Sequence, residues 1–280
     1  MALTDLLVAY DDTPAAQAAL RYALDLKREH NCVLSGAFVH PPAGVAPHMR
    51  RWIGENIISE MEQAEREAAR SREDGFFKIV TAADIARDEV DWIVETGEPG
   101  ATLARIGRFH DLLVVGQFVR AIAGEQGALE PEDLVQKSGR PIVVVPSTYE
   151  STPSRDLAML AWDGSRSSAR ALADTLQFLR PQQRLDVVAV ETGRARDHYA
   201  PMPERDIIVH LQRHGVDARL VTIEAPANRV GHALLDHCEV VRPDLLVIGA
   251  YGRAKFGSHM FGNVTRHILE NMTVPVVVSR

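Results

Sequence analysis

Short segments that are apolar throughout alternate along this chain with longer segments in which apolar residues recur every three or four positions. The first pattern is typical of buried strands and the second of amphipathic helices. Strands are predicted over ten ranges: 3–10, 32–39, 90–95, 111–116, 141–146, 156–162, 184–191, 217–224, 244–249 and 274–279. Helices are predicted over eight: 14–29, 49–73, 99–108, 130–138, 166–179, 203–214, 227–241 and 260–271. Because the strands lack a polar face, helices should cover both sides of a parallel sheet, and we predict an α/β fold.

The pattern occurs twice within the chain. Three pairs of similar segments follow one another in the same order: 6–13 with 158–165, 111–116 with 244–249, and 141–145 with 275–278. Two copies of one unit explain this repetition. We predict doubly wound domains at 1–148 and 154–280, joined by a short polar linker.

The first copy is longer in its middle. Its additional segment, at about 40–89, carries Pro41, Pro42 and Pro47 before the long charged helix predicted at 49–73. We expect this helix either to be solvated or to contact another domain.

Composition narrows the functional classes. The chain has 280 residues, 46% of them hydrophobic, and a net charge of −7. An acidic balance argues against a nucleic-acid partner, which is bound mainly through clustered Lys and Arg. No apolar run approaches the roughly 20 residues that span a bilayer, and no secretory signal opens the chain, so a cytoplasmic protein is expected. Cys32 and Cys238 lie far apart, and we interpret them as inert buried thiols.

The strongest chemical signal follows the strand predicted at 244–249. Gly249, Gly252 and Gly262 form a Gly-x2-Gly-x9-Gly pattern that leads into a predicted helix. Glycines let the backbone approach an anion, and the free N–H groups of a helix start attract negative charge, so the pattern indicates phosphate binding. Asp163 ends another predicted strand and is expected at the same crevice. In the alternative interpretation, the glycines only let the loop turn tightly over the sheet.

These motifs together resemble tandem universal stress proteins over nearly the whole chain. The resemblance rests on five segments: Asp163-Gly-Ser165, Asp244–Gly249, the glycine loop, Gly97-Glu-Pro99 and Thr273–Val278. It implies a Rossmann-like, open five-stranded parallel sheet in each domain and, in one branch of the family, binding of ATP or another adenine nucleotide. It also implies that the domains pack as a pseudo-dimer through the strands at 141–146 and 274–279. Whole chains would then be able to form further homodimers.

The resemblance also implies roles for individual residues. The loop 249–255, with Gly249, Ala250, Gly252, Arg253 and Lys255, would wrap the ribose and phosphates. Gly262, Asn263, Val264 and Thr265 would present the helix start to the outer phosphates. Asp163 would lie by the ribose, the phosphates or a bound Mg2+, and Ala161 and Val190 would flank the adenine. Asn263 stands where the family has Ser or Thr, but its amide can donate to phosphate and Thr265 keeps a hydroxyl nearby.

The first copy departs much further from this pattern. Val119 replaces the second glycine, Leu129 the third, and Asp12 the glycine of Asp-Gly-Ser. Acidic residues also crowd the predicted helix start: Glu130, Glu132 and Asp133. Carboxylates there act as the protein's own anions and repel phosphate, so we predict nucleotide binding in the second copy only.

Other chemistries are less well supported by the residues. Gly252–Ser258 lacks the Lys-Ser/Thr that ends a P-loop. Hydrolysis needs a positioned water, usually with a metal, and the spacing singles out no general base. We expect a regulatory binder of ATP, ADP or AMP, with or without Mg2+. A slow Mg2+-dependent ATPase and a nucleotide-free interaction protein remain the alternatives.

Overall fold

The computed structural model describes residues 3–41, 55–117, 131–151, 156–179, 183–192, 206–250 and 262–280. The first copy contains β1 (Asp5–Ala9), α1 (Pro14–His30), β2 (Val33–His40), α2 (Glu55–Ala82), a 3-10 turn (Arg87–Glu89), β3 (Val90–Thr96), α3 (Pro99–Gly107), β4 (Leu112–Gly116), α4 (Pro131–Ser138) and β5 (Ile142–Val145). The second contains β6 (Leu157–Ala161), α5 (Arg166–Thr175), β7 (Arg184–Glu191), α6 (Ile207–Arg213), β8 (Ala218–Glu224), α7 (Val230–Val241), β9 (Leu245–Gly249), α8 (Asn263–Asn271) and β10 (Val276–Ser279). Each of the predicted strands is present, and the α/β class is confirmed.

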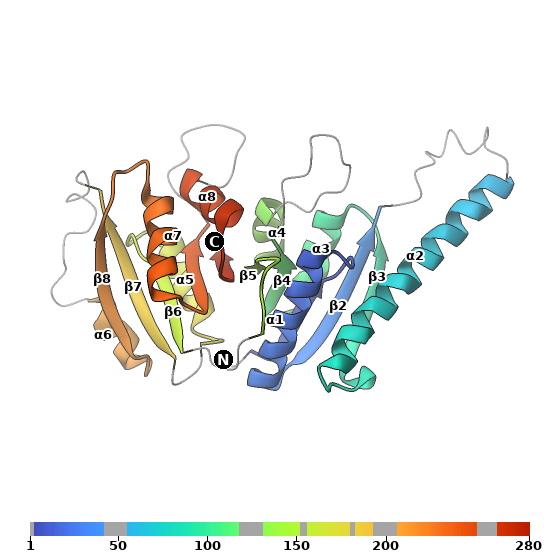
Figure 1. Cartoon of the computed structure of the whole chain (residues 1–280), viewed down its shortest axis with the longest axis horizontal. Coiled ribbons are helices and arrows are strands. Elements are labelled where there is room, and N and C mark those ends of the chain that lie inside the picture. Colours follow the sequence, from blue (N-terminus) through green and yellow to red (C-terminus); the bar gives the residue numbers. More distant parts are fainter. Residues whose placement is uncertain are drawn as a thin grey trace.

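The two copies contribute to one continuous sheet. Its order is β3-β2-β1-β4-β5-β10-β9-β6-β7-β8. Within each copy the five strands are parallel, and both copies have the same strand order. At the centre β5 and β10 pair antiparallel, so the final strands supply the contact predicted for them. Figure 1 shows this centre between the two copies, with β3 and β8 at the outer edges.

Helices cover both faces of the sheet, and each face has its own hydrophobic core. One core contains side chains of α1, α5 and the end of α2, and the other contains side chains of α3, α4, α7 and α8. Each of these cores contains valines of β5 and β10, so each extends across both copies. The strands are apolar throughout because both of their faces are buried.

The helix α2 extends further than the pattern predicted. The expected end near residue 73 is wrong, since the helix runs through Gly75 to Ala82. Phe76 and Val80 are fully buried, and the Phe76 ring meets Tyr10 edge to face at 5.5 Å. The burial of these side chains outweighs the roughly 1 kcal/mol that a glycine costs inside a helix. The last turns of α2 are therefore part of the core, whereas Ile57 near its start is exposed.

Other helices also differ from the prediction at their ends, and α7 begins at Val230 instead of residue 227. α5 stops at Thr175 instead of residue 179, and a turn follows that buries Phe178. α6 spans seven residues and begins after Asp206, whose side chain accepts a hydrogen bond from the Ile208 N–H at 2.8 Å. The predicted residues 49–54, 130, 203–205 and 260–261 lie outside the described part of the chain.

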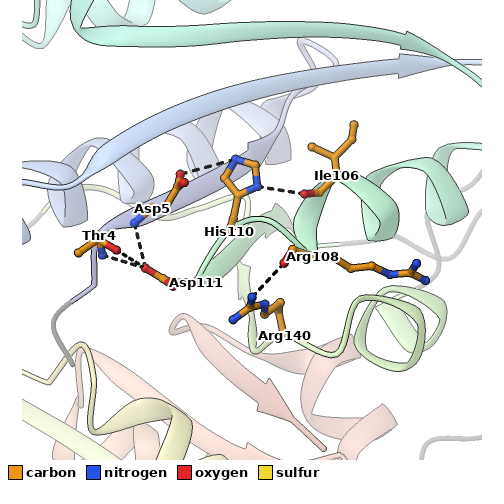
Figure 2. Close-up of polar contacts among 7 residues, drawn as sticks. All are labelled: Thr4, Asp5, Ile106, Arg108, His110, Asp111 and Arg140. Carbon is orange, nitrogen blue, oxygen red and sulfur yellow. Dashed lines mark hydrogen bonds and ion pairs between the residues drawn. The ribbon is translucent and has the colours of Figure 1, made fainter.

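The repeated aspartate before the fourth strand has a structural role. Asp111 accepts hydrogen bonds from the Thr4 N–H (3.0 Å), the Thr4 hydroxyl (2.7 Å) and the Asp5 N–H (3.0 Å), as Figure 2 shows. Asp244 accepts in the same way from the Leu157 N–H at 3.2 Å. Each carboxylate therefore ties the start of the fourth strand of its copy to the start of the first.

Two neighbours complete this cluster in the first copy. The buried His110 donates from Nδ1 to the Ile106 carbonyl (3.1 Å), and its Nε2 lies 3.6 Å from the Asp5 carboxylate. Arg140 donates to the Arg108 carbonyl at 2.9 Å. Burial raises the pKa of Asp111, but the hydrogen bonds from Thr4 and Asp5 and the charge of Arg140 outweigh it and lower that pKa below the ordinary 3.8.

Replacing Asp111 should cost stability at neutral pH and less in acid. Asp111→Ala removes the acceptor of three hydrogen bonds, so we expect a loss of about 1–3 kcal/mol in the free energy of unfolding at pH 7. Because the pKa of Asp111 is lowered in the folded state, its contribution to stability is fully present above pH 3.8. This contribution is lost as the pH falls through the lowered pKa. Urea unfolding at pH 7, 5 and 3 measures the difference in the free energy of unfolding between wild type and Asp111→Ala. Glu239→Ala, at an exposed position, is the control. A difference that grows in acid would contradict this assignment.

Candidate functional site

The candidate site lies where the strand order of the second copy reverses. From β6 the chain passes to β7 on one side, while β9 pairs with β6 on the other. Ligands of open α/β sheets bind beyond the carboxyl ends of strands at such a point. β6 ends at Ala161, two residues before Asp163, and β9 ends at Gly249; the sequence predicted Asp163 and Gly249 at one crevice. The structure brings these two strand ends together.

The turn from β6 into α5 positions Asp163. Gly164 has a φ of 70°, and Ser165 caps α5 by accepting a hydrogen bond from the Ser168 N–H at 3.2 Å. One oxygen of Asp163 accepts from the Ser165 N–H at 3.0 Å, and the side chain is exposed. The turn therefore fixes the carboxylate while leaving it accessible. The sequence interpretation missed the role of Ser165, although a serine directly before an Ala-rich helix is a usual capping signal.

The first copy builds the same turn with a different outcome. Asp12 takes the place of Gly164 and shares its φ of 70°. Its carboxylate accepts from the Tyr10 hydroxyl at 2.8 Å and from the Gln17 amide at 3.2 Å. Burial, and after it the hydrogen bond to Asp12, raises the pKa of Tyr10 above its ordinary value. In the first copy, the turn is therefore hydrogen-bonded to neighbouring residues through the Asp12 side chain, which is absent in the second copy, where Gly164 stands.

The glycine at the end of the fourth strand is required for packing in both copies. A Cβ on Gly249 would lie 2.6 Å from the Ser167 carbonyl carbon and 2.7 Å from the Ser168 nitrogen. A Cβ on Gly116 would meet the backbone of Ala15 at 2.5 Å. Real Cβ contacts are not this short, so each glycine lets its strand end press against the first turn of a helix. Since the degenerate copy shares the feature, Gly249 alone does not indicate nucleotide binding.

The start of α8 differs more clearly between the copies. Gly262 is its N-cap, no side chain caps it, and its first turn contains no acidic residue. Asn263 is exposed and Val264 is half-buried. Thr265 is buried, with its hydroxyl 3.5 Å from the Gly249 carbonyl oxygen, so it holds the helix start against the end of β9. Within the described residues, no side chain accepts a hydrogen bond from the backbone N–H groups of this first turn.

The corresponding helix of the first copy begins differently. α4 starts at Pro131, which has no N–H to donate, and Glu132 and Asp133 follow in its first turn. Carboxylates at this position complement the helix dipole. By sequence, this first turn therefore lacks one N–H donor and carries two acidic residues, whereas the first turn of α8 has no proline and no acidic residue.

The remaining predicted residues lie around the same strand ends. Ala161 is the last residue of β6 and Val190 the last but one of the neighbouring β7, and both contact one hydrophobic core, on the face that α7 and α8 cover. Ala250 is fully buried, and its N–H donates to the Ser279 carbonyl at 2.7 Å. Several residues of the two predicted loops lie outside the described residues: Gly252, Arg253, Lys255, Val119, Leu129 and Glu130.

The described residues contain no cluster of three or more metal-ligating side chains. Within the same ranges, no helix combines the length and the apolar character needed to cross a bilayer. Cys32 and Cys238 are buried, and burial raises their pKa values to about 11 and about 12. Both thiols therefore stay protonated at neutral pH, in agreement with the inert role expected for them.

Comparison with known proteins identifies the class. The fold is that of tandem Rossmann-like α/β domains, and a universal stress protein from Archaeoglobus fulgidus shares it, with a TM-score of 0.67, 16% identity, and coverage of 98% of this chain and 97% of that one. A functionally unknown protein from Pseudomonas aeruginosa, PA1789, superposes with a TM-score of 0.59 at 15% identity, over 99% of this chain and 92% of its own.

The universal stress protein family model matches the chain twice, over residues 3–146 and 155–280. The chain therefore belongs to the universal stress protein family, in its tandem two-domain form. Two universal stress proteins, Rv1996 of Mycobacterium tuberculosis and Mb2019 of Mycobacterium bovis, are each 24% identical to it over 98% of this chain and 94% of their own lengths.

The packing role of the two glycines leads to a prediction. Gly116→Ala and Gly249→Ala should each lower the free energy of unfolding by about 1–3 kcal/mol, because the added Cβ overpacks a backbone contact. Urea unfolding without nucleotide measures both variants against wild type. A loss below about 0.5 kcal/mol in both copies would show that the strand ends do not press on the helices.

Proposed function

We propose that the second copy binds ATP or a related adenine nucleotide at the carboxyl ends of β6 and β9. The observation that carries this proposal is the uncapped start of α8, which follows the Gly-x2-Gly-x9-Gly pattern and has no acidic residue in its first turn. The backbone N–H groups of Asn263, Val264 and Thr265 would donate to the outer phosphates. The family membership supports an adenine nucleotide over other phosphates, as the resemblance of the motifs implies.

The surrounding residues would complete the site. Ala161 and Val190 present small and branched apolar surfaces that suit the faces of an adenine ring. Gly249, Ala250 and Gly252 would let the backbone approach the ribose and phosphates. Arg253 and Lys255 would neutralise phosphate charge. The protein would then act as a nucleotide-responsive regulatory binder in a stress response.

A divalent cation fits this arrangement through one side chain. Mg2+ keeps most of its waters and is held by one or two carboxylates together with substrate phosphates. The exposed Asp163 uses one oxygen to accept from Ser165, which leaves the other for a cation or the ribose. Bound Mg2+ would supply charge neutralisation for the outer phosphates, and Asp163 would orient it.

A new cap on α8 tests the proposal directly. Gly262→Asp places a carboxylate on the free N–H groups, so it should weaken ATP binding at least tenfold while the free energy of unfolding stays the same or rises by about 1 kcal/mol. Gly262→Ala, which adds no acceptor, is the matched control and should bind more tightly than Gly262→Asp. Titration calorimetry with Mg2+ and ATP measures both. Unchanged affinity in Gly262→Asp, or no heat with wild type, would refute this site.

The difference between the copies predicts the stoichiometry. We expect one nucleotide per chain, because Asp12 and the acidic start of α4 occupy the corresponding positions of the first copy. Native mass spectrometry with saturating ATP measures this number. Two nucleotides per chain would show that the first copy also binds. Phosphate release above the buffer control in the same samples would move the assignment from binder to ATPase.

A further inference from the structure

A groove in the first copy lies outside the candidate nucleotide site. It runs between α1 and α2, with a volume of about 700 Å3. This volume is within the range of small-molecule sites, roughly 300–1,000 Å3. Residues of α1 line one side of the groove, and residues of the last turns of α2 line the other. The helices at the corresponding positions of the second copy are shorter: α5 has ten residues and α6 has seven.

Polar contacts hold both ends of the groove. At one end Gly75 of α2 lies against the Asp12 carboxylate, which Tyr10 and Gln17 hold in place. At the other end the Arg28 guanidinium donates to the carbonyl of Ala83. The position of α2 against α1 is thus set by contacts at both ends, and the groove is part of the fold.

The acidic and basic side chains that line the groove differ in whether they have hydrogen-bond or ion-pair partners. Asp25 accepts hydrogen bonds from the Tyr149 hydroxyl (2.9 Å) and the Ser151 hydroxyl (2.6 Å), and lies 3.7 Å from Arg28. Arg21 and Lys78 also line the groove, both are exposed, and neither side chain makes a hydrogen bond or ion pair with another described residue. The groove therefore offers two cationic groups from two different helices, while its carboxylates are already bonded.

The rest of the lining is apolar. Leu24 of α1 is buried, Ile79 and Ala82 belong to the last turns of α2, and Ala83 directly follows that helix. A groove lined by both cationic and apolar side chains suits a ligand that combines an anionic group with a hydrocarbon body. An inorganic anion would use the cations but leave the apolar wall in water.

We propose that this groove is a second ligand site, which binds a small organic anion with an apolar body. Its carboxylate or phosphate monoester group is bound by Arg21 and Lys78, and its hydrocarbon part packs on Leu24, Ile79 and Ala82. Arg21 donates through its planar guanidinium, and Lys78 contributes a point charge. The first copy then carries a ligand site of its own, at a different position from the nucleotide site proposed for the second copy. This inference does not depend on nucleotide binding by the second copy.

Titration calorimetry with decanoate and with decyl phosphate tests the site. Wild type should bind at least one of them saturably, and the tighter of the two identifies the head group. Arg21→Gln and Lys78→Gln should each weaken that affinity about fivefold, and the double variant about twentyfold or more, as expected for lost hydrogen bonds to a charged group. Arg70→Gln, an exposed site on α2 outside the groove, is the matched control and should bind like wild type.

Two further measurements locate the ligand. Ala82→Trp fills the groove without changing its charge and should abolish binding. Decyltrimethylammonium, with the same tail and the opposite charge, should give no saturable heat. Thermal unfolding of each variant confirms that it is folded, and saturating ATP should leave the decanoate affinity unchanged. No saturable binding of either anion, equal binding of the cation, or a double variant within twofold of wild type would overturn the proposal.

Discussion

Three residue pairs between β5 and β10 join two five-stranded sheets into one, and the rest of the molecule depends on this contact. All residues of both strands are buried, and most are valine. Left as edges, such strands would expose unpaired backbone groups on a flat apolar surface, which favours aggregation. Their pairing satisfies those groups and lets each hydrophobic core continue from one copy into the other. Gln117 adds a polar link, since its amide donates from the end of β4 to the Leu269 carbonyl on α8 at 3.1 Å.

Within this shared frame the two copies use the same backbone for different purposes. In both copies, a residue with φ of 70° forms the turn after the first strand. In both, the glycine that ends the fourth strand packs against the start of the helix that follows this turn. In the first copy Asp12 bonds to Tyr10 and Gln17, so the turn is satisfied internally. In the second, Asp163 is exposed and the start of α8 has no side-chain cap. The difference resides in side chains, because the geometry of the sheet is common to both.

Much of the fold was predictable from the sequence, because strands buried on both faces leave a continuous apolar pattern. The pairing of the final strands followed from the family resemblance. The end of α2 was not predictable in this way. Asp74 and Gly75 form a usual stop signal, yet the helix continues because Phe76 and Val80 find a buried position against Tyr10 and the sheet. A distant contact outweighed a local preference.

For the candidate site, the sequence by itself determined which residue types stand at the strand ends and that the two copies differ there. It also determined that Gly249 precedes a helix without acidic residues in its first turn. Only the tertiary structure decided what those residues contact. It places the Thr265 hydroxyl against the Gly249 carbonyl and shows that Gly249 is needed for packing in either copy. The groove between α1 and α2 likewise has no signature in the sequence, because it depends on where two helices far apart along the chain come to lie.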